Sequence, residues 1–91
     1  MDFERDPEKA TENRRKHGIS FEEAKSVFYD ALAATVPDPQ HSWDESRHVI
    51  IGMSKRQRLL IVSFTDRADC CRIISARELT RTERKSLEEK T

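Results

Sequence analysis

The chain has 91 residues, 37% of them charged and 35% hydrophobic, and its formal net charge is zero. A chain of this length forms one domain, residues 1–91, with a small core and a largely ionic surface. Its two glycines cannot supply a glycine-rich phosphate loop, so ATP and dinucleotide chemistry are not expected.

The first predicted elements are a short edge strand over residues 2–5 and a helix that begins at Asp6 and ends near His17. Asp6 is suited to the N-cap, and Pro7 is suited to the first helical position. Gly18 can adopt the left-handed conformation that ends a helix.

A second helix is predicted to begin at Ser20, because Ser20 and Glu23 have the spacing of a capping box. After this helix the hydrophobic period changes to two, which predicts strands over residues 32–36, 47–53, 59–64 and 70–77. A last helix is predicted to begin at Thr80, where Glu83 completes a second capping box.

This order of elements, β-α-α-β-β-β-β-α, predicts an α+β fold. We expect an antiparallel sheet of about four or five strands, with the two N-terminal helices on one face and a C-terminal helix. The adjacent cysteines Cys70 and Cys71 give no disulfide framework, and no apolar run approaches the ~20 residues that span a bilayer. Because the N-terminus also lacks a signal-peptide pattern, we expect a cytoplasmic protein with no membrane association.

The charge is distributed unevenly along the chain. Residues 1–46 contain 6 Lys/Arg and 11 Asp/Glu, whereas residues 47–91 contain 11 Lys/Arg and 6 Asp/Glu. A basic half can bind nucleic acid or an acidic partner segment, although small domains also have uneven charge without a binding role.

Metal ligands are poorly represented in the sequence. The histidines His17, His41 and His48 are far apart, and none belongs to a paired-ligand motif. We therefore expect no metal site and no cofactor.

Arg47, Arg72 and Arg77 lie at the ends of predicted strands. A guanidinium keeps its charge and donates two hydrogen bonds to one anion, which suits a phosphate site. The alternative is that these arginines are solvated and paired with acidic residues. In a regular strand Arg72 and Arg77 would point to opposite faces, because their separation of five residues is odd. Both can serve one site only if the strand bends or bulges before Arg77.

His17 and Glu45 are the candidates for proton transfer. Histidine exchanges a proton near neutral pH, but a histidine at the end of a helix also interacts favourably with the helix dipole. Glu45 precedes Arg47 by two residues, so the two share a face of an extended chain. They form either an ion pair or an acid/base group beside a charge-stabilising group.

Two segments, Lys16 through Ala24 and Arg72 through Arg77, are the most specific motifs of the chain. Shorter ones occur before, between and after them: Phe3-Glu4, Asp6-Pro7, Lys9-Ala10, Asn13, Val27-Phe28, Asp30, Asp38, His41-Ser42, Glu45, Arg47, Ile51-Gly52, Thr65 and Arg67. In these residues the chain resembles the BrnT-type toxins of bacterial type II toxin–antitoxin pairs, in order and over nearly its whole length.

The resemblance implies a fold similar to that of RelE-type ribonuclease toxins, RNA cleavage and inhibition of translation. It also implies a cognate antitoxin with a DNA-binding domain, a complex with two copies of each chain, and binding to operator DNA through the antitoxin. The chain differs from the usual family pattern at Arg5, where relatives often carry an aromatic residue, and at Leu87, where many carry a tyrosine.

From this resemblance and from RNA chemistry we expect metal-independent cleavage, in which the 2′-OH attacks the neighbouring phosphorus. Negative charge then builds on the phosphate oxygens, where fixed cations stabilise it. The expected catalytic residues are Arg72, Arg77, Arg47, His17 and Glu45, and the expected RNA-binding residues are Lys16, Lys55 and Arg58. The alternative is a catalytically weak or inactive module that binds the antitoxin and acts as a co-repressor.

Overall fold

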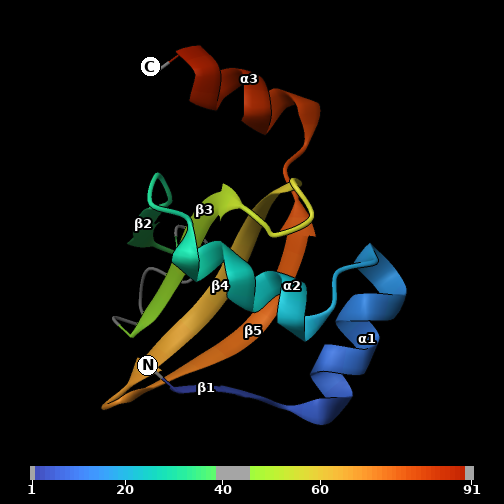
Figure 1. Cartoon of the computed structure of the whole chain (residues 1–91), viewed down its shortest axis with the longest axis vertical. Coiled ribbons are helices and arrows are strands. Elements are labelled where there is room, and N and C mark those ends of the chain that lie inside the picture. Colours follow the sequence, from blue (N-terminus) through green and yellow to red (C-terminus); the bar gives the residue numbers. More distant parts are fainter. Residues whose placement is uncertain (1, 39–45, 90–91) are drawn as a thin grey trace.

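The computed structural model describes residues 2–38 and 46–89 (Figure 1). Its elements follow the predicted order, with a short 3-10 helix, η1, directly after α2. They are β1 (Asp2–Arg5), α1 (Pro7–His17), α2 (Phe21–Ser26), η1 (Val27–Tyr29), β2 (Ala34–Pro37), β3 (Arg47–Met53), β4 (Leu59–Arg67), β5 (Cys70–Glu78) and α3 (Arg81–Glu89).

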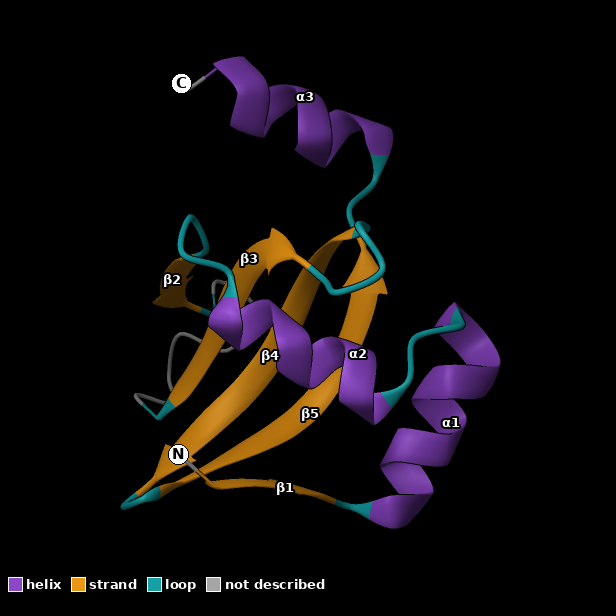
Figure 2. Cartoon of the chain, in the orientation of Figure 1, coloured by secondary structure: helices purple, strands orange, loops and turns teal. Residues whose placement is uncertain are grey.

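The five strands form one sheet in the order β1-β5-β4-β3-β2 (Figure 2). Strands β2 to β5 pair antiparallel with their neighbours, whereas β1 pairs parallel with β5. The predicted α+β class and strand number are confirmed, and the sheet is mixed rather than wholly antiparallel. A hairpin turn forces its two strands to be antiparallel, but β1 is joined to β5 through most of the chain and is under no such constraint.

Helix α1 begins and ends as its sequence predicts. The Asp6 carboxylate accepts hydrogen bonds from the backbone N–H groups of Glu8 and Lys9, and Gly18 ends the helix with φ of 70°. The helix flanks β5 beyond the end of β1 (Figure 1), where Asn13 Oδ1 accepts a hydrogen bond of 3.0 Å from the backbone of Ala76. This contact places the C-terminal end of α1 beside the last residues of β5.

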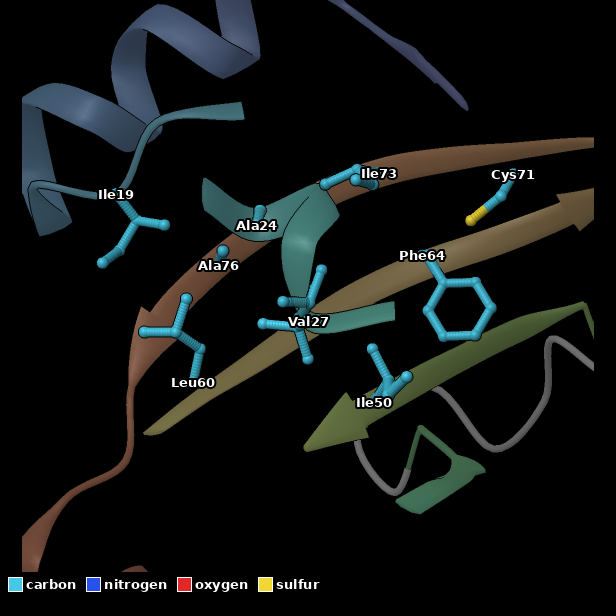
Figure 3. Close-up of a cluster of buried hydrophobic side chains, with 10 residues drawn as sticks. Ile19, Ala24, Val27, Ile50, Leu60, Phe64, Cys71, Ile73 and Ala76 are labelled. Atoms are coloured by element: carbon cyan, nitrogen blue, oxygen red, sulfur yellow. The ribbon is translucent and has the colours of Figure 1, made fainter. Parts of the chain in front are cut away.

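The core lies between α2 with η1 and one face of the sheet (Figure 3). Val27, Leu60 and Val62 are fully buried there, together with Ile19, Ala24, Ile50, Phe64, Cys71, Ile73 and Ala76. We call the opposite face of the sheet the open face. Helix α3 lies at one end of the sheet (Figure 1), where Ser86 and Leu87 line a cavity with Ile51 and Ile61 of the open face.

A buried carboxylate joins α2 to the turn between β3 and β4. Glu23 is 1% exposed, and its oxygens accept hydrogen bonds from Ser54 Oγ at 2.7 Å and from Arg58 Nε at 2.8 Å. Arg58 Nη2 donates to Glu23 and, at 3.0 Å, to the carbonyl of Gly18. The hydrogen bonds from Arg58 lower the pKa of Glu23 despite its burial. Of the predicted capping box only the Ser20 half forms, because the Glu23 carboxylate binds Arg58 instead.

Gly52 of β3 lies against Val27 and the segment after η1. A Cβ atom at this position would lie 2.8 Å from Ala33 Cβ, 3.0 Å from Asp30 Oδ2 and 3.2 Å from Val27 Cγ1. We expect Gly52→Ala to lower the free energy of unfolding by about 1–3 kcal/mol, as overpacking of a core does. Denaturant unfolding measures the change. Because Ala33 supplies the nearest atom, adding Ala33→Gly should recover part of the loss. Full stability of the single variant would contradict the proposed clash.

Candidate functional site

A β-bulge in β5 places Arg72 and Arg77 on the same face of the sheet. Ser63 of β4 pairs with Ser75, but the next residue, Phe64, pairs with Ile73, so Ile74 is an extra residue in β5. Ile73 and Ala76 consequently both point into the core, although they are three residues apart. The bulge shifts the alternation of side chains. It therefore resolves the odd spacing of the two arginines, which both project from the open face.

The open face contains a cavity of about 300 Å³. Charged and polar side chains form most of its lining: Arg47, Arg77, Asp38, Glu83, His17, Ser63 and Ser75. Val49, Ile61 and Ala76 complete it. The two serines are register partners on β4 and β5. Three of the predicted catalytic residues, on α1, β3 and β5, thus surround one cavity.

Arg77 is held by the first turn of α3. Its Nη1 and Nη2 donate to the two carboxylate oxygens of Glu83, at 2.7 and 3.0 Å. The same carboxylate accepts a hydrogen bond from the backbone N–H of Thr80, so the second predicted capping box is complete. The bond from Arg77 lowers the pKa of Glu83 to about 2, and Glu83 in turn raises the pKa of Arg77. The guanidinium of Arg77 therefore binds the Glu83 carboxylate in the bidentate geometry with which it would bind a phosphate.

Arg47 begins β3 on the other side of the cavity. Its Nε lies 3.5 Å from Oδ2 of Asp38, whose side chain is buried. Within the described part of the chain this Nε is buried and has no hydrogen-bond partner. His17, the last residue of α1, also lines the cavity.

The other predicted residues lie elsewhere. Arg72 is on the open face but outside the cavity, and its Nε donates to Glu4 of β1 at 3.1 Å. Lys16 is exposed and lies 3.6 Å from Glu12. Lys55 is exposed in the turn between β3 and β4, and Arg58 binds the buried Glu23. Glu45, together with His41, falls outside the described residues.

Asp38 and Glu83 are the charged cavity residues that sequence reasoning missed as site residues. Glu83 was identified only as a capping residue, and its contact with Arg77 depends on how α3 follows β5. Ser63 also carried a signal, because it interrupts the apolar residues of β4 at a position that alternates with the core residues Val62 and Phe64. Such alternation indicates a strand with one polar face.

The stability contributed by Glu83 is expected to depend on pH. Its pKa in the folded chain is about 2, below the ordinary value of 4.5, so this stability is complete above about pH 5 and is lost as the pH falls towards 2. Glu83→Gln keeps a capping side chain but does not titrate. Denaturant unfolding at several pH values should show the native chain more stable than this variant at pH 7. The difference should shrink at acid pH, and a constant difference would contradict the assigned pKa.

A second cavity, of about 430 Å³, lies at the hairpin between β4 and β5 and is lined by Asp2, Asp66 and Asp69 with both cysteines. Its acidic lining would repel a phosphate. Across residues 2–38 and 46–89, no three His, Cys, Asp or Glu side chains are arranged to hold a metal ion. No helix in these residues is long and apolar enough to cross a bilayer.

Comparison with known proteins gives two findings. The model of the family described as the ribonuclease toxin BrnT of type II toxin–antitoxin systems matches residues 6–83. Among solved structures, the ribonuclease toxin BrnT of Brucella abortus is 25% identical in sequence, with a TM-score of 0.71. The match covers 89% of this chain and 99% of that one. No curated protein matches the chain.

Proposed function

Because the chain belongs to the BrnT family of ribonuclease toxins of type II toxin–antitoxin systems, we propose that it cleaves RNA in the cavity on the open face of its sheet. The observation that carries this proposal is the convergence of two guanidinium groups and one imidazole, from Arg47, Arg77 and His17, on one cavity. These three groups come from three separate elements, so their convergence is a property of the fold and not of one sequence motif.

The chemistry follows from RNA itself. The 2′-OH attacks the adjacent phosphorus, the bond from phosphorus to the 5′ oxygen breaks, and the products are a 2′,3′-cyclic phosphate and a 5′-OH. One proton leaves the 2′-OH, and one is delivered to the departing oxygen. We assign a proton transfer to His17, which is worth roughly 10²–10⁴-fold when well placed. Arg47 and Arg77 stabilise the charge that develops on the phosphate oxygens.

Substrate binding requires Arg77 to exchange partners. In the structure both of its donating nitrogens bind Glu83, so the scissile phosphate must replace that carboxylate. The exchange is chemically conservative, because a phosphate offers the same pair of acceptor oxygens to a planar fork. Glu83 then lies beside the reacting group, where its released carboxylate is a second candidate for proton transfer. The role expected for Glu45 stays a prediction.

The family also supports a proposal about partners. A type II toxin has a cognate antitoxin, and we assign to it a DNA-binding domain, a complex with two copies of each chain, and binding to operator DNA through the antitoxin. RNA cleavage in the cytoplasm would inhibit translation and arrest growth.

The metal-independent mechanism is tested directly by chelation. We expect purified protein to cleave naked RNA at the same rate in EDTA as without it, because the proposed charge stabilisation comes from arginine side chains. Gel analysis of the fragments, with detection of the cyclic phosphate end, measures both rate and chemistry. Loss of cleavage in EDTA that added Mg²⁺ restores would contradict the proposed mechanism.

The co-repressor function is the second candidate. It is favoured by the occupied fork of Arg77 and by Leu87, which stands in α3 where many relatives carry a tyrosine. Inducible expression separates the two functions. Growth arrest by the native chain that disappears in an Arg47→Gln variant, still folded by circular dichroism, supports the ribonuclease. Tight antitoxin binding without growth arrest supports the co-repressor.

A further inference from the structure

A row of polar side chains crosses four strands on the open face. Strand pairing places Glu4 of β1 beside Arg72 of β5, Arg72 beside Thr65 of β4, and Thr65 beside Arg47 of β3. Paired residues project from the same face of a sheet, and each of these four alternates with residues that point towards the core. The row therefore forms a continuous polar band next to the cavity.

Two polar atoms in this row are buried without a hydrogen bond. Within the described residues, Thr65 Oγ1 and Arg47 Nε are inaccessible to solvent and make no hydrogen bond, although Arg47 Nε lies 3.5 Å from the Asp38 carboxylate. Buried polar atoms are rarely left unpaired in native proteins, so an adjacent pair of them needs an explanation. Both can donate a hydrogen bond, and so can the guanidinium of Arg72 on the other side of Thr65. Three donors side by side fit an anion.

The row is separate from the site at Arg77 but close to it. Arg72 pairs with Thr65 and Arg77 pairs with Ile61, four residues away on β4, which corresponds to roughly 13 Å along the strand. Arg47 belongs to both places, since it lines the cavity and ends the row. A single phosphate cannot occupy both sites, whereas a nucleic acid strand carries several phosphates in sequence.

We infer that Arg72, Thr65 and Arg47 form a second phosphate subsite, which binds a phosphate flanking the scissile linkage of a single RNA strand. This inference rests on the proposed function and refines it. Arg72 is then a binding residue, and it leaves Glu4 when the strand binds. Glu4, the acidic member of the row, competes with the phosphate for Arg72.

The subsite predicts different kinetics for short and long substrates. A dinucleotide has one phosphate and fills the cavity alone, whereas an oligonucleotide also reaches the row. For the oligonucleotide, Arg72→Gln is expected to raise KM about tenfold with little change in kcat, because one charged contact to the substrate is lost. For the dinucleotide it should change neither constant. Glu4→Gln is expected to lower KM for the oligonucleotide, because it frees Arg72, and Arg14→Gln in exposed α1 is the matched control.

Two results would overturn the subsite. An unchanged KM for the oligonucleotide in Arg72→Gln means that no phosphate binds there, and a fall in kcat on the dinucleotide means that Arg72 acts on the scissile phosphate itself. If the native chain cleaves neither substrate, the proposed function fails, but a measurement of RNA binding still tests the phosphate subsite. Arg72→Gln should then weaken the binding of a 2′-O-methyl oligonucleotide and reduce the slope of log affinity against log salt by about 0.7. Unchanged affinity rejects the subsite in that case.

Discussion

Replacing Arg77 by glutamine is expected to lower kcat/KM for RNA cleavage by about 10²–10³-fold, the effect of removing one fixed donor from a developing oxyanion. Arg77 is the only arginine of β5 that lines the cavity in the described structure, and its fork already grips a carboxylate in a bidentate manner. Arg77→Lys keeps the charge but cannot donate two parallel hydrogen bonds, so it should recover only part of the rate. Single-turnover cleavage of RNA by the purified variants measures the effect.

The matched control for this prediction is Arg81→Gln. Arg81 is an exposed arginine in α3, so the change alters the net charge equally without touching the cavity. Since Arg77 also anchors α3 through Glu83, thermal unfolding must show that the Arg77 variants remain folded under the assay conditions. Cleavage at the native rate by folded Arg77→Gln would remove the central group from the proposed site.

The largest expected effect on stability comes from Glu23→Ala. This change removes a carboxylate that is 1% exposed and that accepts hydrogen bonds from both Arg58 and Ser54. Breaking a buried ion pair costs about 3 kcal/mol or more, because the remaining polar groups lose their partner. For a domain of this size, 3 kcal/mol lowers Tm by roughly 12–24 °C.

Differential scanning calorimetry of Glu23→Ala and of its neighbour Glu22→Ala measures this effect. Among the described residues Glu22 forms an ion pair with Lys25 alone, at the surface, where its side chain is 59% exposed, so its loss should change Tm little. Equal shifts for the two variants would show that burial of Glu23 contributes nothing beyond a surface ion pair.

Features governed by neighbouring residues could be predicted from the sequence. Asp6 and Gly18 bound α1, and Thr80 and Glu83 cap α3, because each acts within a few residues of its partner. Arg47, Arg77 and His17, which line the cavity, belong to the catalytic residues expected from the sequence, and their catalytic role stays a prediction. The bulge at Ile74 decides that Arg77 shares the open face with Arg72, and the sequence left open whether such a bulge exists.

Features governed by long-range pairing escaped sequence reasoning. The bulge exists only in relation to β4, and no local pattern in β5 marks it. Arg58 was expected to bind RNA, but in the structure it forms an ion pair with Glu23, 35 residues away in sequence. Arg72 was expected in the catalytic set, but the parallel pairing of β1 places Glu4 beside it. In each case a partner distant in the chain decides what a charged side chain does.

The pairing of β1 with β5 has a consequence for biosynthesis. Asp2 pairs with Cys70 and Arg5 with Ile73, so the first strand has no partner strand until the fifth has left the ribosome. Contacts between such distant segments form late in folding, because a long loop must close first. Arg77 and the first turn of α3 emerge later still. A nascent chain of this design therefore has no assembled cavity through most of its translation.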